Sequence, residues 1–141
     1  MSRMDELLAA LPPAPFVEHL GLRFTELGEG WAESALTTTP RLTQAQGLVH
    51  AGVLATIADH TAGAAAATLV DEGRYVVTTE FKINLLRPVI APRVHCRAEV
   101  VKPGRRITVV ESRVSAESDD GERALAAIAL LTLAVVGDHA V

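Results

Sequence analysis

The chain has 141 residues, which is enough for one domain with a buried core and too few for two ordinary domains. Its hydrophobic fraction of 49% and charged fraction of 21% are typical of a globular protein and exclude extended disorder. A net charge of −4 argues against a nucleic-acid-binding protein. We therefore expect a single domain over residues 1–141 that has no nucleic-acid partner.

Cysteine usage and the N-terminus indicate where the chain resides. Cys96 is the only cysteine, which excludes an intramolecular disulfide framework, and the first residues lack the basic and apolar regions of a secretory signal. The apolar run at residues 48–70 is long enough to span a bilayer, but it is dominated by Ala and contains an acid, two His and three Thr. We therefore expect a cytoplasmic location and no membrane partner.

The N-terminal third is predicted to contain short helices followed by a hairpin. Residues 4–11 have the pattern of a short amphipathic helix that ends at Pro12-Pro13, and residues 16–20 can form a second helical turn. We treat residues 1–20 as a helical extension. Residues 22–27 and 31–38 then read as two strands joined by a glycine-containing turn.

The middle of the chain is predicted to be one long helix. A polar loop at residues 40–47 precedes an Ala-rich apolar run whose composition and length favour a helix over residues 49–70. The sequence Asp71-Glu72-Gly73 ends it.

The C-terminal half has the alternation of β-strands. Residues 77–85 place Val77, Thr79, Phe81, Ile83 and Leu85 on one face and Thr78 on the other. Further strands are expected at residues 94–100, 107–115 and 124–136, the last being apolar on both faces. The fold class is therefore α+β, with a curved antiparallel sheet wrapped around a central helix.

Asp59 is the residue that most needs an explanation, because it lies in an apolar run with no Lys or Arg. Burying an ionised carboxylate without a partner is costly. Asp59 is therefore expected to be solvated in a cleft, hydrogen-bonded, or held for chemistry.

His50 precedes Asp59 by nine positions, which on a helix is about 13 Å of rise and about 900° of rotation. The two side chains would lie at opposite ends and on opposite faces of the helix. If both serve one site, that site combines two copies of the chain in a twofold dimer with two equivalent sites.

The segment at residues 44–52 leads into the start of the helix, where unpaired backbone N–H groups face outward. One such donor can stabilise a developing oxyanion by roughly 3 kcal/mol. The alternative is that His50 is only a helix cap or a satisfied core histidine.

The spacing of Gln44, Gly47, His50, Gly52 and Asp59 resembles the active-site segment of the PaaI-type hotdog-fold acyl-CoA thioesterases. Residues 78–88 resemble the strand that follows the helix in that family, and residues 101–106 resemble its next turn. The likeness runs from about residue 16 to residue 137. It implies a hotdog fold, assembly as a homodimer or a dimer of dimers, and hydrolysis of an acyl-CoA without a metal or redox cofactor.

The resemblance also implies roles for individual residues. Asp59 would be the nucleophile or general base, and the Ala51 N–H would contact the oxyanion. His50 would shape the helix start near the thioester, and Gln44 would orient the carboxylate, the water or the carbonyl. Thr78, from the same subunit as Asp59, would help to hold the attacking water.

This chain departs from the family at Ala51, where the family has Gly. The N–H survives this change, but a methyl group is added where the thioester approaches. Gly52 is assigned to the substrate site. Gly63, with Ala66 and Ala67, lies on the Asp59 face of the helix and either leaves room for an acyl group or allows close packing on the sheet. His60 points about 100° away from Asp59 and is interpreted as structural or interfacial.

Basic residues are concentrated in the second half of the chain, where residues 82–113 contain eight Lys or Arg against two acids. They can simply alternate outward along exposed strands. With the family in view, four of them are candidates for the phosphates of coenzyme A: Arg87, Lys102, Arg105 and Arg106.

Two other functions stay open at this point. One is a non-catalytic hotdog protein that binds acyl-CoA, and the other is a hotdog enoyl-CoA hydratase or dehydratase, which needs a general acid and base beside the thioester.

Overall fold

The computed structural model describes residues 2–137. Its elements in chain order are α1 (Arg3–Ala10), α2 (Pro15–Leu20), β1 (Arg23–Gly28), β2 (Trp31–Thr37), the 3-10 helix η1 (Pro40–Leu42), α3 (Ala51–Ala67), β3 (Tyr75–Leu85), β4 (Arg93–Lys102), β5 (Ile107–Glu117) and β6 (Arg123–Val136). These confirm the predicted order of hairpin, long helix and four strands.

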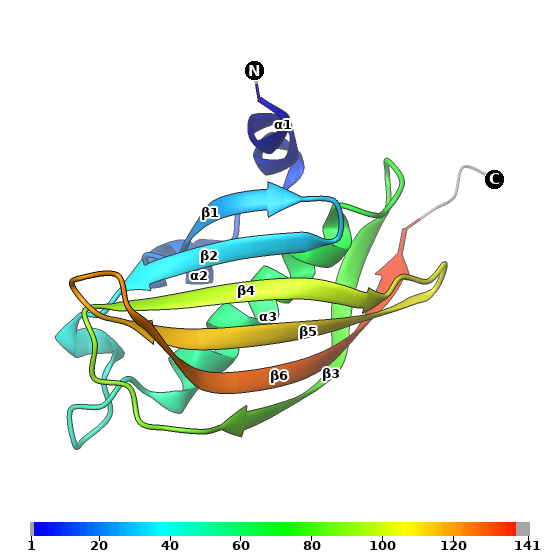
Figure 1. Ribbon diagram of the computed structural model, residues 1–141. Coiled ribbons are helices and arrows are strands. Elements are labelled where there is room, and N and C mark those ends of the chain that lie inside the picture. The colour runs from blue at the N-terminus through cyan, green and yellow to red at the C-terminus, as the bar shows by residue number, and fades with distance from the viewer. Residues whose placement is uncertain (1, 138–141) are drawn as a thin grey trace.

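The six strands form one sheet in the order β1-β2-β4-β5-β6-β3, and every neighbouring pair is antiparallel. Figure 1 shows the sheet curving around α3, which lies across its inner face. Strand β3 follows α3 in the chain and is the last strand in this order, paired with β6. It therefore forms one edge of the sheet, next to the helix. The predicted α+β class and hotdog arrangement are confirmed.

Small side chains let α3 lie close to the sheet. Ile57, Ala58, Ala62 and Ala65 are completely buried against inward-facing strand residues such as Val94 and Leu131. Alanine suits this position because it has the highest helix propensity and adds little bulk. The helix is therefore held rigidly enough to serve as the base of a site.

Two buried hydrogen bonds fix the rotation of α3 about its own axis. The hydroxyls of Ser34 and Thr61 lie 2.6 Å apart, and the Ser112 hydroxyl donates to the Ala58 carbonyl at 2.8 Å. Buried polar groups of this kind are costly when unpaired, so they disfavour other rotations of the helix. Asp59, which follows Ala58, is thereby directed to the side of the helix that faces β3.

The helix is shorter at both ends than the predicted range of 49–70. Val49 is held outside it because its N–H donates to the Val89 carbonyl at 3.0 Å and the residue bridges to Thr43. At the other end the Thr68 hydroxyl donates to the Ala65 carbonyl and accepts the Gly30 N–H. Contacts with distant residues therefore set both ends.

Strand β3 also differs from the prediction, because its alternation is interrupted. Its pairing with β6 shifts between Thr78 and Glu80, which is a β-bulge. As a result Thr78 and Phe81 both lie on the side of α3, where each lines a hollow that contains Asp59. The predicted separation of these two residues onto opposite faces is wrong.

The N-terminal helices lie beside the hairpin. Ser2 caps α1 in a capping box with Asp5, and the half-buried residues Leu7, Leu8 and Leu11 pack against the core. No residue of α1 is fully buried. Residues 10–14 then pass close to α3 before α2 begins.

Within residues 2–137, no helix is long and apolar enough to cross a membrane. The extension of the domain over all of residues 1–141 stays a prediction, because residues 1 and 138–141 lie outside the described part.

Candidate active site

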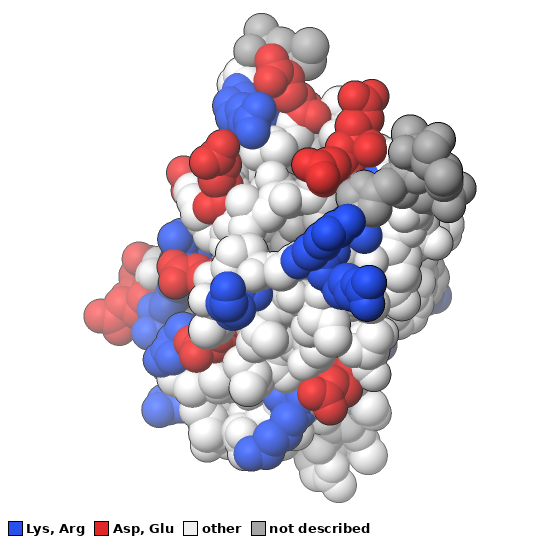
Figure 2. Space-filling model, turned by 90° about the vertical axis from the view of Figure 1, so that its right-hand side faces the viewer, with Lys and Arg blue, Asp and Glu red and all other residues white. Residues whose placement is uncertain are grey.

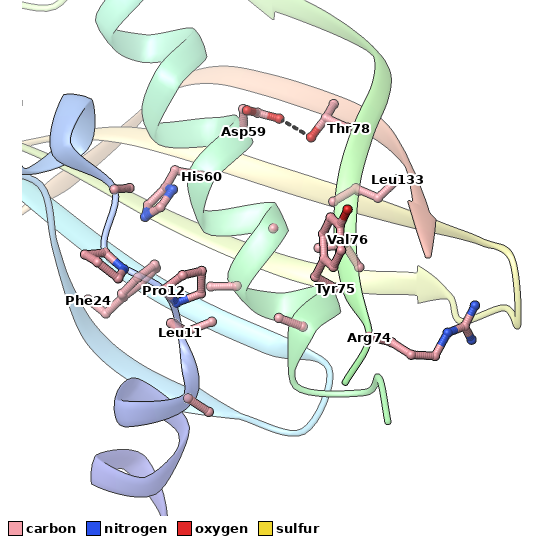
Figure 3. Close-up of a pocket in the computed structure, with 16 residues that line it drawn as sticks. Leu11, Pro12, Phe24, Asp59, His60, Arg74, Tyr75, Val76, Thr78 and Leu133 are labelled. Atoms are coloured by element: carbon pink, nitrogen blue, oxygen red, sulfur yellow. Dashed lines mark hydrogen bonds between the residues drawn. The ribbon is translucent and has the colours of Figure 1, made fainter. Parts of the chain in front are cut away.

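Asp59 is paired with Thr78. The Thr78 hydroxyl on β3 donates to Oδ1 of Asp59 on α3 at 2.6 Å, as Figure 3 shows. Both side chains are half-buried. A hydroxyl bond to a carboxylate is charge-assisted and strong, so it holds the carboxylate in one orientation while Oδ2 stays available. Asp59 is thus a hydrogen-bonded acid in a cleft, which agrees with two of the three expected explanations.

A cavity of about 370 Å3 opens beside this pair, and we call it the Asp59 cavity. Its floor is α3, where Gly63, Ala64 and Ala67 expose little side chain, and its other walls are β3 and residues 10–14. A Cβ built on Gly63 would meet no atom within 4 Å, so this glycine faces open space. Ala66, predicted for the same face, is instead buried in the core.

His60 lines the Asp59 cavity as well, although it was predicted to be structural or interfacial. Its ring stacks on that of Phe24, with ring centroids 5.2 Å apart and an interplanar angle of 24°. Burial lowers the pKa of His60, while the nearby Asp59 raises it to a smaller extent. The ring is consequently a neutral group held in place by an aromatic neighbour.

A second hollow, of about 290 Å3, lies on the other side of Asp59, and we call it the Phe81 hollow. Its lining includes Phe16 of α2, Phe81 of β3 and Thr56 of α3. Asp59 and His60 line both spaces, so the carboxylate lies between them. The hollow was not predicted, because the alternation of residues 77–85 placed Phe81 away from Thr78.

The start of α3 is built around His50, which is the N-cap of the helix. Its Nδ1 accepts the Gly52 N–H at 2.8 Å, so a neutral His50 ring carries its proton on Nε2. A Cβ at Gly52 would lie only 3.0 Å from this Nδ1, which explains why glycine fits here. The cap reading of His50 is confirmed, and the ring remains exposed.

The Ala51 N–H is left free by this cap. Ala51 is the first residue of α3, and no acceptor for its N–H is present within residues 2–137. Ala51 is exposed and lines a third hollow, of about 330 Å3, together with Gln44 and Arg87. We call it the Ala51 hollow. Gln44 is held there by its side-chain carbonyl, which accepts the N–H groups of Gln46 and Leu48.

The predicted site residues therefore fall into two separate groups within one chain. Asp59, Thr78 and Gly63 share one cavity, whereas Gln44 and Ala51 share another. Asp59 follows Ala51 by eight positions on the helix, which is about 12 Å along the axis. One chain therefore holds a carboxylate and an N–H donor that cannot act on the same atom.

The four predicted basic residues are divided in the same way. Arg87 lies in the Ala51 hollow, while Lys102, Arg105 and Arg106 are exposed at the β4–β5 turn near the other end of the sheet. Arg74 joins the second group, because its guanidinium donates to the Arg105 carbonyl at 3.1 Å. Figure 2 faces this end of the molecule and shows Lys and Arg side chains close together there.

Comparison with known proteins identifies the family. The thioesterase superfamily profile matches residues 46–122, which include His50, Asp59 and Thr78. The chain belongs to the thioesterase superfamily. Its membership confirms the resemblance to PaaI-type hotdog thioesterases and identifies the chain as a thioester hydrolase.

Individual relatives agree over most of the chain. A thioesterase family protein from Silicibacter pomeroyi has a TM-score of 0.89 and 36% identity, covering 95% of this chain and 98% of that one. A Haemophilus influenzae thioesterase has a TM-score of 0.81 and 28% identity, covering 100% and 96%. The proofreading thioesterase EntH of Cronobacter turicensis is 31% identical over 101 residues, which is 72% of this chain and 74% of that protein.

Sequence reasoning missed the aromatic and linker residues around Asp59. Phe24 and Pro12 reach the Asp59 cavity from segments that lie far from residue 59 in the chain. The sequence did contain one signal, since Phe24 is one of only three Phe residues in a chain with 4% aromatics. Its position against His60 depends on how the hairpin packs on α3.

Proposed function

We propose that this protein hydrolyses acyl-CoA thioesters at two equivalent sites, each shared between two copies of the chain. The observation that carries the proposal is the Asp59–Thr78 pair in the wall of a cavity, in a thioester hydrolase whose free Ala51 N–H lies about 12 Å away along α3. A thioester hydrolase needs both an attacking group and an oxyanion donor near one carbonyl. A second copy supplies the missing half.

Edge strand β3 supports pairing with a second copy. It is 11 residues long, and Tyr75, Val77, Phe81 and Leu85 are 59%, 46%, 45% and 51% exposed. A long edge strand with exposed apolar side chains readily pairs with another strand. Two β3 strands that paired antiparallel about a twofold axis would cover these side chains.

The same pairing would bring the two half-sites together. The Asp59 cavity adjoins the first half of β3 through Tyr75 and Thr78, whereas the Ala51 hollow adjoins its end through Leu85. In an antiparallel pair, the end of one strand lies beside the start of the other. The N–H of Ala51 from one copy would therefore approach Asp59 of the other.

The reaction follows from these two groups. In the general-base route, Asp59 takes a proton from water, and the oxygen of that water adds to the thioester carbonyl carbon. The tetrahedral oxyanion is stabilised by the Ala51 N–H of the other copy. Its collapse breaks the C–S bond and releases coenzyme A thiolate, which takes up the proton, and the free carboxylic acid.

The nucleophile route uses the same residues in a different order. Asp59 attacks the carbonyl carbon and forms a mixed anhydride with loss of coenzyme A thiolate, and water then hydrolyses the anhydride. In both routes Thr78 orients the carboxylate and water is the only co-substrate, so we propose that no cofactor takes part. A single turnover in 18O-labelled water distinguishes them, since only the anhydride route can transfer a carboxylate oxygen of Asp59 to the product.

The dimer would also reunite the basic residues. Arg87 lies near the end of β3, and Arg74 with Arg105 lies near its start. Antiparallel pairing places Arg87 of one copy on the side of Arg105 and Arg106 of the other. We propose that these residues bind the phosphates of coenzyme A, whose negative charge suits guanidinium groups.

The test measures thiol release from a panel of short, medium and aromatic acyl-CoAs. We expect turnover with some members of the panel and a loss of at least about a hundredfold in kcat for Asp59→Asn. Glu26→Gln is the matched control, because it neutralises an exposed carboxylate of β1, at the opposite edge of the sheet from β3, and should leave kcat unchanged. Absence of thiol release from the whole panel, or full activity of Asp59→Asn, contradicts the proposal.

A further inference from the structure

Arg74 connects three parts of the chain at one end of the sheet. One terminal nitrogen of its guanidinium donates to the Arg105 carbonyl at 3.1 Å, and the other donates to the Val135 carbonyl at 3.2 Å. Val135 in turn donates its own N–H to the Arg106 carbonyl at 2.8 Å. The start of β3, the β4–β5 turn and strand β6 are therefore joined in a closed ring of hydrogen bonds.

The β4–β5 turn depends on these bonds for its position. The antiparallel pairing of β5 with β6 ends at Ile107 and Ala134, so residues 103–106 lie beyond the paired strands. Segments that extend past a sheet are usually more mobile than the strands they connect. A side chain that bonds the turn from β3 consequently restricts its motion.

The same turn carries positive charges suited to phosphate. Lys102, Arg105 and Arg106 are all exposed, and Figure 2 shows Lys and Arg side chains close together at this end of the molecule. The ring of hydrogen bonds uses the carbonyl oxygens of Arg105 and Arg106, so it fixes the backbone from which two of these cationic side chains extend. Because each segment that must be ordered on binding lowers the affinity, a turn that is already ordered binds an anion more tightly.

Arg74 itself is poorly placed to bind a phosphate. A bidentate contact with phosphate uses two neighbouring N–H groups of one guanidinium. Here both terminal nitrogens already donate to carbonyl oxygens, and Nε is buried with no hydrogen-bond partner within residues 2–137. A buried donor without a partner is costly, so the two carbonyl bonds are what hold the guanidinium in this place.

Arg74 is also directed away from the reacting groups. Together with Tyr75 it lines the Asp59 cavity, but Figure 3 shows its guanidinium pointing away from Asp59 and Thr78. The side chain thus lies between the cavity and the β4–β5 turn. An effect of Arg74 through the turn is therefore expected on substrate binding and not on the chemical step.

We propose that Arg74 is a positioning residue, which holds the β4–β5 turn in the conformation that presents Lys102, Arg105 and Arg106 to the phosphates of a coenzyme A thioester. This role rests on the proposed hydrolysis of acyl-CoA and adds the residue on which its phosphate site depends. A phosphate contact far from the carbonyl is made equally before and during the reaction. Its loss raises KM and leaves kcat unchanged.

The experiment compares one acyl group on two carriers. The best substrate of the thiol-release panel is offered as its coenzyme A thioester and as its pantetheine thioester, which lacks every phosphate. We expect wild type to favour the coenzyme A thioester by at least about tenfold in kcat/KM. In Arg74→Met, KM for the coenzyme A thioester should rise roughly tenfold, whereas its kcat and the kcat/KM for the pantetheine thioester should change by less than about twofold.

Two further variants separate positioning from charge. Arg74→Lys keeps the positive charge, but one ammonium nitrogen cannot replace both terminal nitrogens of a planar guanidinium, so KM should rise nearly as far as in Arg74→Met. Arg23→Met is the matched control, because it removes a positive charge from an exposed position of β1, at the opposite edge of the sheet from β3, and should leave KM unchanged. Circular dichroism and thermal melting establish that each variant is folded, and Arg74→Lys carries the test if Arg74→Met is not.

A double-mutant cycle tests whether Arg74 acts through the turn. In a chain that carries both Arg105→Gln and Arg106→Gln, Arg74→Met should no longer raise KM, because the turn then has fewer charges to present. An additional rise equal to that in wild type contradicts the positioning role.

The other outcomes separate the two levels of the proposal. An unchanged KM in Arg74→Lys overturns the positioning role, since charge alone would then suffice. An equal loss on the pantetheine thioester overturns it as well, because the effect would then lie in the cavity or the fold, and so does a wild type that hydrolyses both carriers equally well. Each of these results leaves the proposed hydrolysis standing, whereas no thiol release from either carrier overturns both.

Discussion

Ala51→Pro is the sharpest test of the shared site, because it removes one N–H and little else. Ala51 is the first residue of α3, a position where proline is tolerated and where its fixed φ suits the helix. The preceding residue, His50, has φ −62° and ψ 137°, which is the extended conformation that proline requires before it. The exposed side chain has room for the ring. We therefore expect the helix and its His50 cap to survive.

The expected loss of activity follows from the role of the N–H. Removing one oxyanion donor typically raises the barrier by about 2.7–4 kcal/mol, which is a fall of roughly a hundred- to a thousandfold in kcat. Because the free N–H binds nothing else in residues 2–137, its loss should change the melting temperature by only a few degrees. Ala51→Gly keeps the N–H and should retain activity, so it serves as the control.

Mixing subunits then tests whether the site is shared. In a heterodimer of Ala51→Pro and Asp59→Asn chains, one site contains both lesions and the other contains neither. Random reassortment, by co-expression or by unfolding and refolding together, makes half of the dimers mixed, so activity should recover to roughly a quarter of wild type. The activity of the mixture is measured by thiol release against the two parents.

Two results would contradict this reasoning. If the mixture is no more active than its parents although mass spectrometry shows that heterodimers have formed, then Ala51 and Asp59 do not serve one site from different chains. If Ala51→Pro alone keeps full activity, then its N–H is not the oxyanion donor.

Three further expectations follow from the described contacts. Thr78→Val should lower kcat/KM by about 10- to 150-fold, since a hydrogen bond to a charged group contributes about 1.5–3 kcal/mol. Thr79→Val is the control, because the hydroxyl of this exposed neighbour bonds the Thr132 carbonyl and not Asp59, so kcat/KM should stay unchanged. Gly63→Ala should raise the free energy of unfolding in urea by about 0.5–1 kcal/mol and lower kcat/KM for the bulkier acyl-CoAs, because its methyl group points into the Asp59 cavity. Burial, and secondarily Arg123, lower the pKa of His95 from its ordinary value of 6.5. The neutral ring therefore makes its full contribution to the free energy of unfolding above pH 6.5, and that contribution is lost as the pH falls through the lowered pKa, by up to about 1.4 kcal/mol per pH unit. His95→Asn should flatten this pH dependence between pH 7.5 and 5, as measured by urea unfolding.

Local sequence patterns sufficed for the type and order of the elements. Alternation identified β4 and β5 because each has one face on the core, and the Ala-rich run identified α3 because propensity and length agree there. The apolar run that forms β6 shows no alternation and was predicted as a strand because it follows strands joined by tight turns. Residues 44–59 could also be identified as the candidate site segment, because both a lone acid in an apolar helix and the start of that helix can be recognised from residues that are close together in the sequence. Each of these predictions depends only on residues that are close together in the sequence.

What the sequence could not provide depends on contacts between distant segments. The first two residues of the predicted helix lie outside α3, because the Val49 N–H donates to the carbonyl of Val89, forty residues further along, and His50 is the N-cap. Phe24 reaches His60 because the hairpin packs over α3. The walls of the Asp59 cavity come from residues 10–14, α3 and β3, which are distant from one another in the sequence, and no local pattern describes them.

The bulge in β3 shows how one irregularity builds the surroundings of Asp59. Thr78 and Phe81 are three residues apart, so a regular strand would place them on opposite faces of the sheet. The shift between Thr78 and Glu80 turns both toward α3, where Thr78 bonds the carboxylate and Phe81 lines the hollow on its other side. Bulges often redirect side chains next to active sites. A regular β3 would leave Asp59 with either its hydrogen-bond donor or its aromatic neighbour, and the bulge is the reason it has both.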